Sequence, residues 1–163
     1  MSTVDRILER NARYASGFTG QDLPAEPSLR LAVVTCMDAR LETGRLLGLA
    51  EGEAHVIRNA GGVVTEDALR SLTISQRLLG TREVMVVLHT GCGMLGFRGP
   101  ELAERIEAET GLRPPFDFGT FEDLEEEVRR GVARVRGCAF LPHRDAVRGF
   151  VVDLETGRLR EVA

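Results

Sequence analysis

The chain has 163 residues, of which 43% are hydrophobic and 28% are charged, and its net charge at pH 7 is −4. This balance predicts a single soluble domain over residues 1–163 with a core of its own. The basic residues are scattered, which argues against a nucleic-acid-binding protein. No apolar run reaches the length of a membrane span, which argues against a membrane protein.

All 21 basic residues are arginine, so chemistry that requires a lysine is excluded. This removes Schiff-base enzymes and the Walker A class of nucleotide-binding proteins. Three cysteines do not suggest a disulfide scaffold, and the N-terminal stretch is charged and amphipathic, unlike a signal peptide. We therefore expect a reduced, cytoplasmic protein, in which clustered cysteines more often bind metal or react.

The first half of the chain alternates between helical and extended patterns. Residues 3–16 carry apolar side chains at helical spacing, and a turn-rich connection with two prolines follows. A buried strand is then expected to end at Cys36, followed by a short helix over 42–49. A second strand over 54–62 runs into a glycine turn.

The second half continues the alternation. Thr65 and Gly80 have the residue types of a helix N-cap and a helix stop. The third strand is continuously apolar over 84–88, as parallel strands covered on both faces are. Two more helices are expected over 100–111 and 120–137.

The last segment, 147–162, resembles a β-hairpin. The order of elements predicts an α/β fold with a mainly parallel sheet flanked by helices and an antiparallel element at the C-terminus. In such sheets, ligands bind at the carboxyl ends of the strands. Three polar stretches fall there: Cys36–Arg40, Arg58–Gly62 and His89–Cys92.

Cys36, His89 and Cys92 are candidate zinc ligands, because Zn²⁺ favours thiolate and imidazole and a catalytic zinc uses three protein ligands. His89 and Cys92 are three residues apart, and Gly91 eases a tight bend between them. For His89 and Cys92 alone, a strand-end histidine and a core cysteine are the simpler interpretation. Once the Cys36–Arg40 stretch is included, a metal site becomes the better interpretation.

Asp38 and Arg40 follow Cys36 at alternating positions. If the chain stays extended, all three side chains point to the same side. An aspartate there can accept a hydrogen bond from a metal-bound hydroxide or compete as a fourth ligand, and Arg40 can hold it bidentately. The alternative is a solvated ion pair that contributes little.

Three other candidates are weaker. His55 begins a strand and is expected at the opposite edge of the sheet. Cys138 is interpreted as a small buried hydrophobic residue and His143 as a loop histidine.

With these residues the chain resembles the β-class carbonic anhydrases. The pattern of that family is Cys-x-Asp-x-Arg followed, some fifty residues on, by His-x-x-Cys. Here it stands as Cys36–Arg40 and His89–Cys92, and Arg58–Gly62 resembles the segment beside the active site of the family. The similarity runs from about Val33 to Gly93, and the length is that of the compact, minimal members.

The resemblance implies a carbonic anhydrase (a zinc lyase, or carbonate dehydratase) that hydrates carbon dioxide reversibly to bicarbonate and a proton. Cys36, His89 and Cys92 would bind Zn²⁺, and Asp38 and Arg40 would form the catalytic dyad that orients the attacking zinc-bound hydroxide. Asp38 is also a possible fourth ligand in a closed state.

The resemblance also implies a homodimer or homotetramer, in which residues 1–18 form a helical arm that packs on a partner subunit. Some relatives are regulated by bicarbonate at a site that includes a tryptophan, and this chain has none.

Two other functions stay open. One is hydrolysis of carbon disulfide or carbonyl sulfide at the same zinc, since both are linear electrophiles like carbon dioxide. The other is a non-catalytic zinc-binding or thiol-sensing module, which would have four protein ligands.

Overall fold

The computed structural model describes residues 1–96 and 98–163, and a five-stranded sheet lies at its centre. The strand order is β2-β1-β3-β4-β5, where β1 to β4 are parallel and β5 pairs antiparallel with β4. The strands are β1 (Leu31–Cys36), β2 (Ala54–Asn59), β3 (Glu83–His89), β4 (Val147–Val152) and β5 (Leu159–Glu161). The predicted α/β class, with its antiparallel C-terminal hairpin, is confirmed.

The helices lie close to their predicted positions, and the capping residues explain why. The Thr65 side chain accepts a hydrogen bond from the amide of Ala68, and Gly80 ends the same helix in the left-handed conformation. The helices are α1 (Thr3–Ala15), α2 (Thr43–Leu47), α3 (Glu66–Leu79), α4 (Gly99–Thr110) and α5 (Leu124–Gly137).

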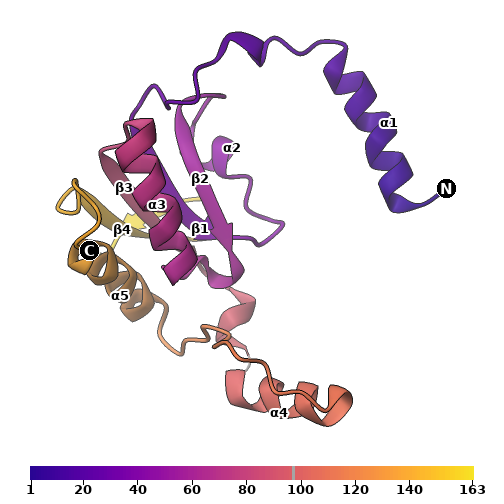
Figure 1. The fold of residues 1–163 in the computed structure, drawn as a ribbon, viewed down its shortest axis with the longest axis vertical. Coiled ribbons are helices and arrows are strands. Elements are labelled where there is room, and N and C mark those ends of the chain that lie inside the picture. The colour runs from indigo at the N-terminus through magenta and orange to yellow at the C-terminus, as the bar shows by residue number, and fades with distance from the viewer. Residues whose placement is uncertain (97) are drawn as a thin grey trace.

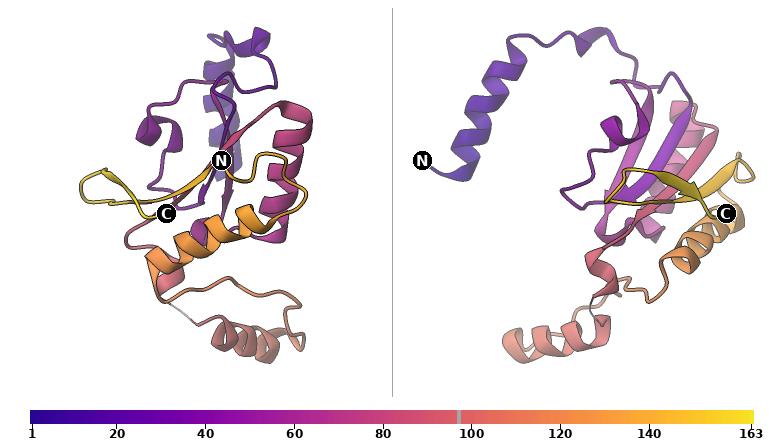
Figure 2. Two further views of the ribbon diagram at one scale, coloured as in Figure 1. Left: turned by 90° about the vertical axis from the view of Figure 1, so that its left-hand side faces the viewer. Right: turned by 180° about the vertical axis from the view of Figure 1, so that it is seen from behind.

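Helices α3 and α5 cover one face of the sheet, and α2 lies on the other face (Figures 1 and 2). The close approach of α5 to β4 depends on Gly149, because a Cβ atom there would lie 2.9 Å from Val132 and nearer still to Val128. Helix α5 leads into β4, which is parallel to β3. The first turn of α5 therefore lies near the carboxyl ends of the parallel strands, where β1 and β3 end.

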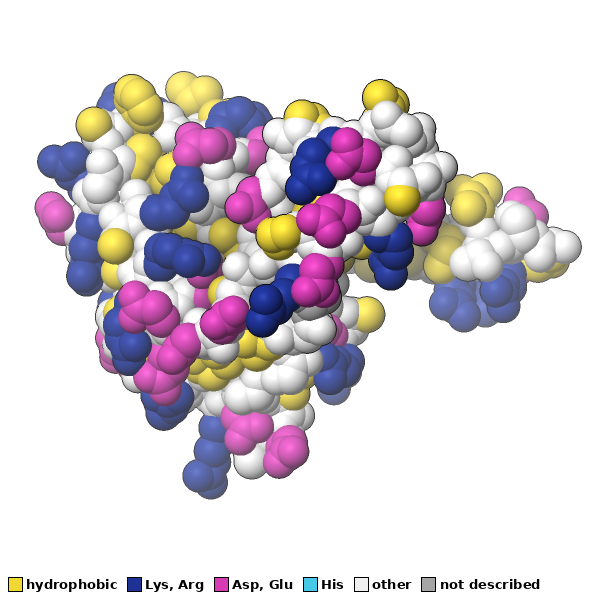
Figure 3. Space-filling view, turned by 90° about the horizontal axis from the view of Figure 1, so that it is seen from below, with side chains coloured by type: hydrophobic (Ala, Val, Ile, Leu, Met, Phe, Trp, Pro, Cys, Tyr) yellow, Lys and Arg dark blue, Asp and Glu magenta, His cyan; other side chains and the backbone are white. Residues whose placement is uncertain are grey.

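Helix α1 projects from the body of the molecule (Figure 1) and contains no buried residue. Its apolar side chains Val4, Ile7 and Leu8 are between 51% and 66% exposed. No helix in the described part of the chain combines the length and apolar character needed to cross a membrane. Seen from the α4 end, acidic and basic side chains are interspersed over the surface (Figure 3).

Candidate metal centre

The adjacent parallel strands β1 and β3 bring together residues that are more than fifty positions apart. Cys36 is the last residue of β1, His89 is the last residue of β3, and Cys92 follows three positions later. Their ligand atoms all lie within 4.8 Å of one another, and all three residues are buried. Among the described residues, this is the one group of three or more potential metal ligands so arranged.

The bend between His89 and Cys92 is fixed by Thr90 and Gly91. The amide of Thr90 donates to the carbonyl of Val152 at 3.0 Å, and its hydroxyl accepts from the amide of Leu154 at 3.0 Å. Gly91 has a φ of 62°, in the left-handed region that glycine adopts without strain. The predicted bend is confirmed.

The imidazole of His89 is fully buried and has one nitrogen without a partner. Its Nδ1 donates to the carbonyl oxygen of Thr90 at 2.9 Å, so Nε2 carries the lone pair. Nε2 has no hydrogen-bond partner among the described residues, and the Oδ2 atom of Asp38 is 3.8 Å away. A buried polar atom left unpaired costs about 1–3 kcal/mol, and a metal ion would satisfy it.

The chemistry of the donor set fits Zn²⁺. Two cysteine sulfurs and one imidazole nitrogen are ligands that this ion prefers. Burial raises the pKa of the Cys92 thiol, with nearby Cys36 and Asp38 acting in the same direction and the Met94 amide opposing them. A bound cation would reverse this balance in favour of the thiolate.

The chain does not stay extended from Cys36 to Arg40, so the condition under which three side chains would align on one side is not met. The amide of Leu41 donates to the carbonyl of Asp38 at 3.0 Å, which marks a turn. The amide of Arg40 also donates to Oδ1 of Asp38 at 2.9 Å, so the aspartate side chain stabilises the turn.

Asp38 and Arg40 nevertheless meet as predicted. The Nε atom of Arg40 donates to Oδ1 at 2.9 Å and Nη2 donates to Oδ2 at 2.7 Å. These hydrogen bonds hold the pKa of the Asp38 carboxyl well below its usual range. The Asp38 side chain is 18% exposed and that of Arg40 is 59% exposed, so the carboxylate is much less solvated than in an ordinary surface pair.

Arg40 also connects the two halves of the site, since its Nη2 donates to the carbonyl of Gly91 at 2.9 Å. Oδ1 of Asp38 accepts two hydrogen bonds, whereas Oδ2 accepts one and keeps a free lone pair. Oδ2 is the atom that lies 3.8 Å from Nε2 of His89. The free acceptor position of Asp38 is thus on the oxygen nearer the cluster.

The Arg58–Gly62 segment supports the end of β1. Arg58 donates to the carbonyls of Cys36 and Asp38 at 2.9 and 2.8 Å. A Cβ atom on Gly62 would lie 2.9 Å from the amide nitrogen of Cys36, so only glycine fits there. The glycine turn was predicted, but the contacts of Arg58 were not, because they depend on β2 lying beside β1.

The weaker candidates lie where the sequence predicted. His55 is near the start of β2, where its ring nitrogens contact Ser75 and the carbonyl of Ala25. Cys138 is buried at the end of α5, and His143 is exposed. None of them belongs to the cluster.

Comparison with known proteins agrees with this geometry. A family model described as carbonic anhydrase matches residues 31–110. Beta-carbonic anhydrase 1 of Mycobacterium tuberculosis is 51% identical over 162 residues, which cover 99% of both chains. The chain belongs to the β-class carbonic anhydrase family.

This carbonic anhydrase family member is also similar to a solved structure and to an enzyme with another substrate. A crystal structure of carbonic anhydrase from Streptococcus mutans matches with a TM-score of 0.93 and 41% identity, covering 100% of this chain and 99% of that one. A carbon disulfide hydrolase of Saccharolobus solfataricus is 47% identical over 158 residues, covering 81% of this chain and 76% of its own.

Replacement of Cys36 by serine should abolish stable zinc binding. Loss of a ligand should weaken zinc affinity by more than the roughly 10- to 100-fold that changes around the ligands cause. The measurement is the zinc content per chain after dialysis against a weak chelator. Cys138→Ser is the matched control, since that cysteine is also buried but lies outside the cluster. Equal zinc retention by both variants would contradict the assignment.

Proposed function

We propose that this chain catalyses the reversible hydration of carbon dioxide to bicarbonate and a proton, with Zn²⁺ held by Cys36, His89 and Cys92. The observation that carries the proposal is the buried triad, whose ligand atoms lie within 4.8 Å of one another, beside an ionised Asp38. Membership of the β-class family supports it.

Three protein ligands suit a catalytic zinc, because structural zinc sites almost always have four. When bound, Zn²⁺ supplies a Lewis acid that lowers the pKa of a coordinated water from about 15.7 towards 7. No fourth side chain joins the triad among the residues that the structure describes. The three ligands would therefore leave one coordination position of the zinc ion open for the reaction.

Asp38 would orient the attacking water. Because its carboxyl group stays ionised, it can only accept hydrogen bonds. The free lone pair of Oδ2 can accept the O–H of that water and turn an oxygen lone pair towards carbon dioxide. Arg40 holds the carboxylate through both oxygens and so fixes this direction.

A closed state with Asp38 as a fourth ligand would require its contacts with Arg40 to break. Hydrogen bonds to charged groups contribute about 1.5–3 kcal/mol each, and Asp38 accepts three from Arg40. We therefore propose that the Arg40-bound position of Asp38 is the working one.

Stopped-flow measurement of carbon dioxide hydration by the zinc-loaded protein tests this function. Asp38→Asn keeps the size of the side chain but removes the charge, and should lower kcat/KM by roughly 100-fold or more with zinc content unchanged. Cys36→Ala should lose both zinc and activity. Hydration by Asp38→Asn at the wild-type rate would refute the role of Asp38.

The carbon disulfide hydrolases among the relatives motivate the alternative function. The same protein preparations should be assayed with carbon disulfide, following release of hydrogen sulfide. Faster turnover of carbon disulfide than of carbon dioxide would favour the alternative.

We also propose that residues 1–163 form one domain that assembles as a homodimer or homotetramer, with residues 1–18 as an arm on the partner subunit. The exposed apolar face of α1 supports this assembly, because such a face is normally covered. A further exposed apolar residue, Val56, lies on the edge strand β2 and is 42% exposed.

Replacement of Ile7 and Leu8 by glutamine should weaken this assembly. Burial of each side chain contributes about 1.5–3 kcal/mol, so the dissociation constant should rise by about 100-fold or more. Sedimentation velocity over a range of concentrations measures it. Arg10→Gln, on the same helix, is the control, and an unchanged assembly in the double variant would argue against the arm.

A cytoplasmic location is proposed from the cysteines. All three are free and buried, and two belong to the candidate ligand set, which must stay reduced to bind a metal.

A further inference from the structure

A cavity of about 690 Å³ lies between the segment that follows Cys92 and the start of α5. Leu95, Phe121 and Glu127 line it from three different parts of the chain. A water molecule occupies roughly 30 Å³ of liquid volume, so the cavity has room for many.

Short segments that carry or support the metal-ligand candidates also border this cavity. The amide of Leu95 donates to the carbonyl of Cys92 at 3.1 Å. Phe121 and Met94 both pack on Gly61, since a Cβ atom built there would lie 3.1 and 3.0 Å from their side chains. The turn that contains Gly61 also supports Cys36, so the same short segments border both sites.

Glu127 is a buried acid of α5 that lines this cavity. Its side chain is only 2% exposed and forms an ion pair with Arg130, one turn further along α5. The atom of Glu127 in this ion pair is Oε2, which contacts Nη2 of Arg130. The neighbouring acids Glu125 and Glu126 are 39% and 69% exposed, so the helix turns this one carboxyl group inward.

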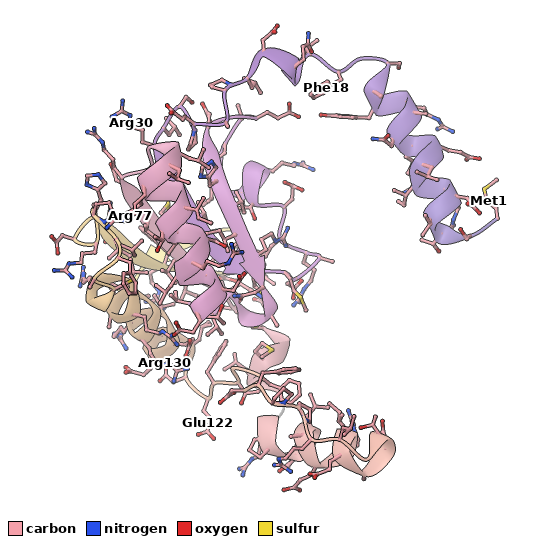
Figure 4. All side chains as sticks on the ribbon, viewed as in Figure 1. Met1, Phe18, Arg30, Arg77, Glu122 and Arg130 are labelled. Carbon is pink, nitrogen blue, oxygen red and sulfur yellow. The ribbon has the colours of Figure 1, made fainter. Side chains whose placement is uncertain are left out.

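Other charged groups surround Glu127, and Figure 4 shows Arg130 on α5 and Glu122 in the preceding loop. Burial raises the pKa of the Glu127 carboxyl, and Glu126 adds to this, while Arg130 and Arg134 act in the opposite direction. The charged residues that line the cavity or act on Glu127 are Arg98, Glu122, Asp123, Glu126, Arg130 and Arg134.

Burying an acid beside a cavity that can hold many water molecules lowers the stability of the fold, and such groups are more common at functional sites. The proposed reaction provides a use for it, because each hydration of carbon dioxide releases one proton that must reach the solvent. A carboxylate can accept a proton from water and return it to a buffer.

We propose that Glu127 accepts the proton released by carbon dioxide hydration, through water in this cavity, and passes it to buffer in the solvent. Carbon dioxide and water give bicarbonate and a proton. The proton converts the Glu127 carboxylate to the neutral acid, and a buffer base then removes it and restores the carboxylate. This inference rests on the proposed function.

Steady-state hydration kinetics of Glu127→Gln in dilute and in concentrated imidazole buffer test the proposal. In dilute buffer kcat should fall about 10-fold, because it includes proton export, while kcat/KM should stay within about twofold. Concentrated imidazole should restore kcat by replacing the carboxylate. Glu126→Gln, on the same helix and cavity, should behave as the wild type.

A loss of kcat and kcat/KM together in Glu127→Gln, without rescue by imidazole, would overturn the proposal and leave a structural role. An inactive wild type would overturn both this inference and the proposed function, whereas an active wild type with buffer-independent Glu127→Gln would overturn this inference alone.

If Glu127→Gln fails to fold, Glu127→Asp carries the test: its kcat should depend on buffer more strongly than that of the wild type, and identical dependence would overturn the proposal.

Discussion

The guanidinium group of Arg40 connects the two halves of the metal centre. It donates to both carboxylate oxygens of Asp38, after β1, and to the carbonyl of Gly91, in the bend after β3. Charged, bidentate contacts of this kind fix direction as well as distance. This one side chain therefore fixes the position of the Asp38 carboxylate and leaves a free lone pair on its Oδ2 atom. It also holds the turn after β1 against the bend after β3.

The parallel sheet makes this contact possible. Because β1 lies beside β3, their carboxyl ends deliver Cys36 and His89 to the same place. Among the described residues, Nε2 of the buried His89 imidazole has no protein partner, and burial raises the pKa of the Cys92 thiol. A bound metal ion would pair with the imidazole nitrogen and favour the thiolate, so metal binding should stabilise the folded state as well as enable chemistry.

The sequence predicted the helices, the strands and the candidate ligands, and it missed features that depend on long-range packing. Thr65 and Gly80 mark a helix through local hydrogen bonds and backbone conformation, so they can be recognised in isolation. The contacts of Arg58 require the order of β2 and β1, which no local pattern encodes. The turn at Asp38 was missed because a side chain competes with the extended backbone there. Glu127 stands in a run of three glutamates, and only the orientation of α5 against the sheet distinguishes it from its neighbours.

A crystal structure of the zinc-loaded protein, determined below and above neutral pH, tests the central claim most directly. Zn²⁺ should be bound by the sulfurs of Cys36 and Cys92 at about 2.3 Å and by Nε2 of His89 at about 2.0 Å. Above neutral pH, Asp38 should remain on Arg40, and a solvent oxygen should complete the tetrahedron. Zinc bound elsewhere, or Asp38 bound to the metal at every pH, would contradict the account.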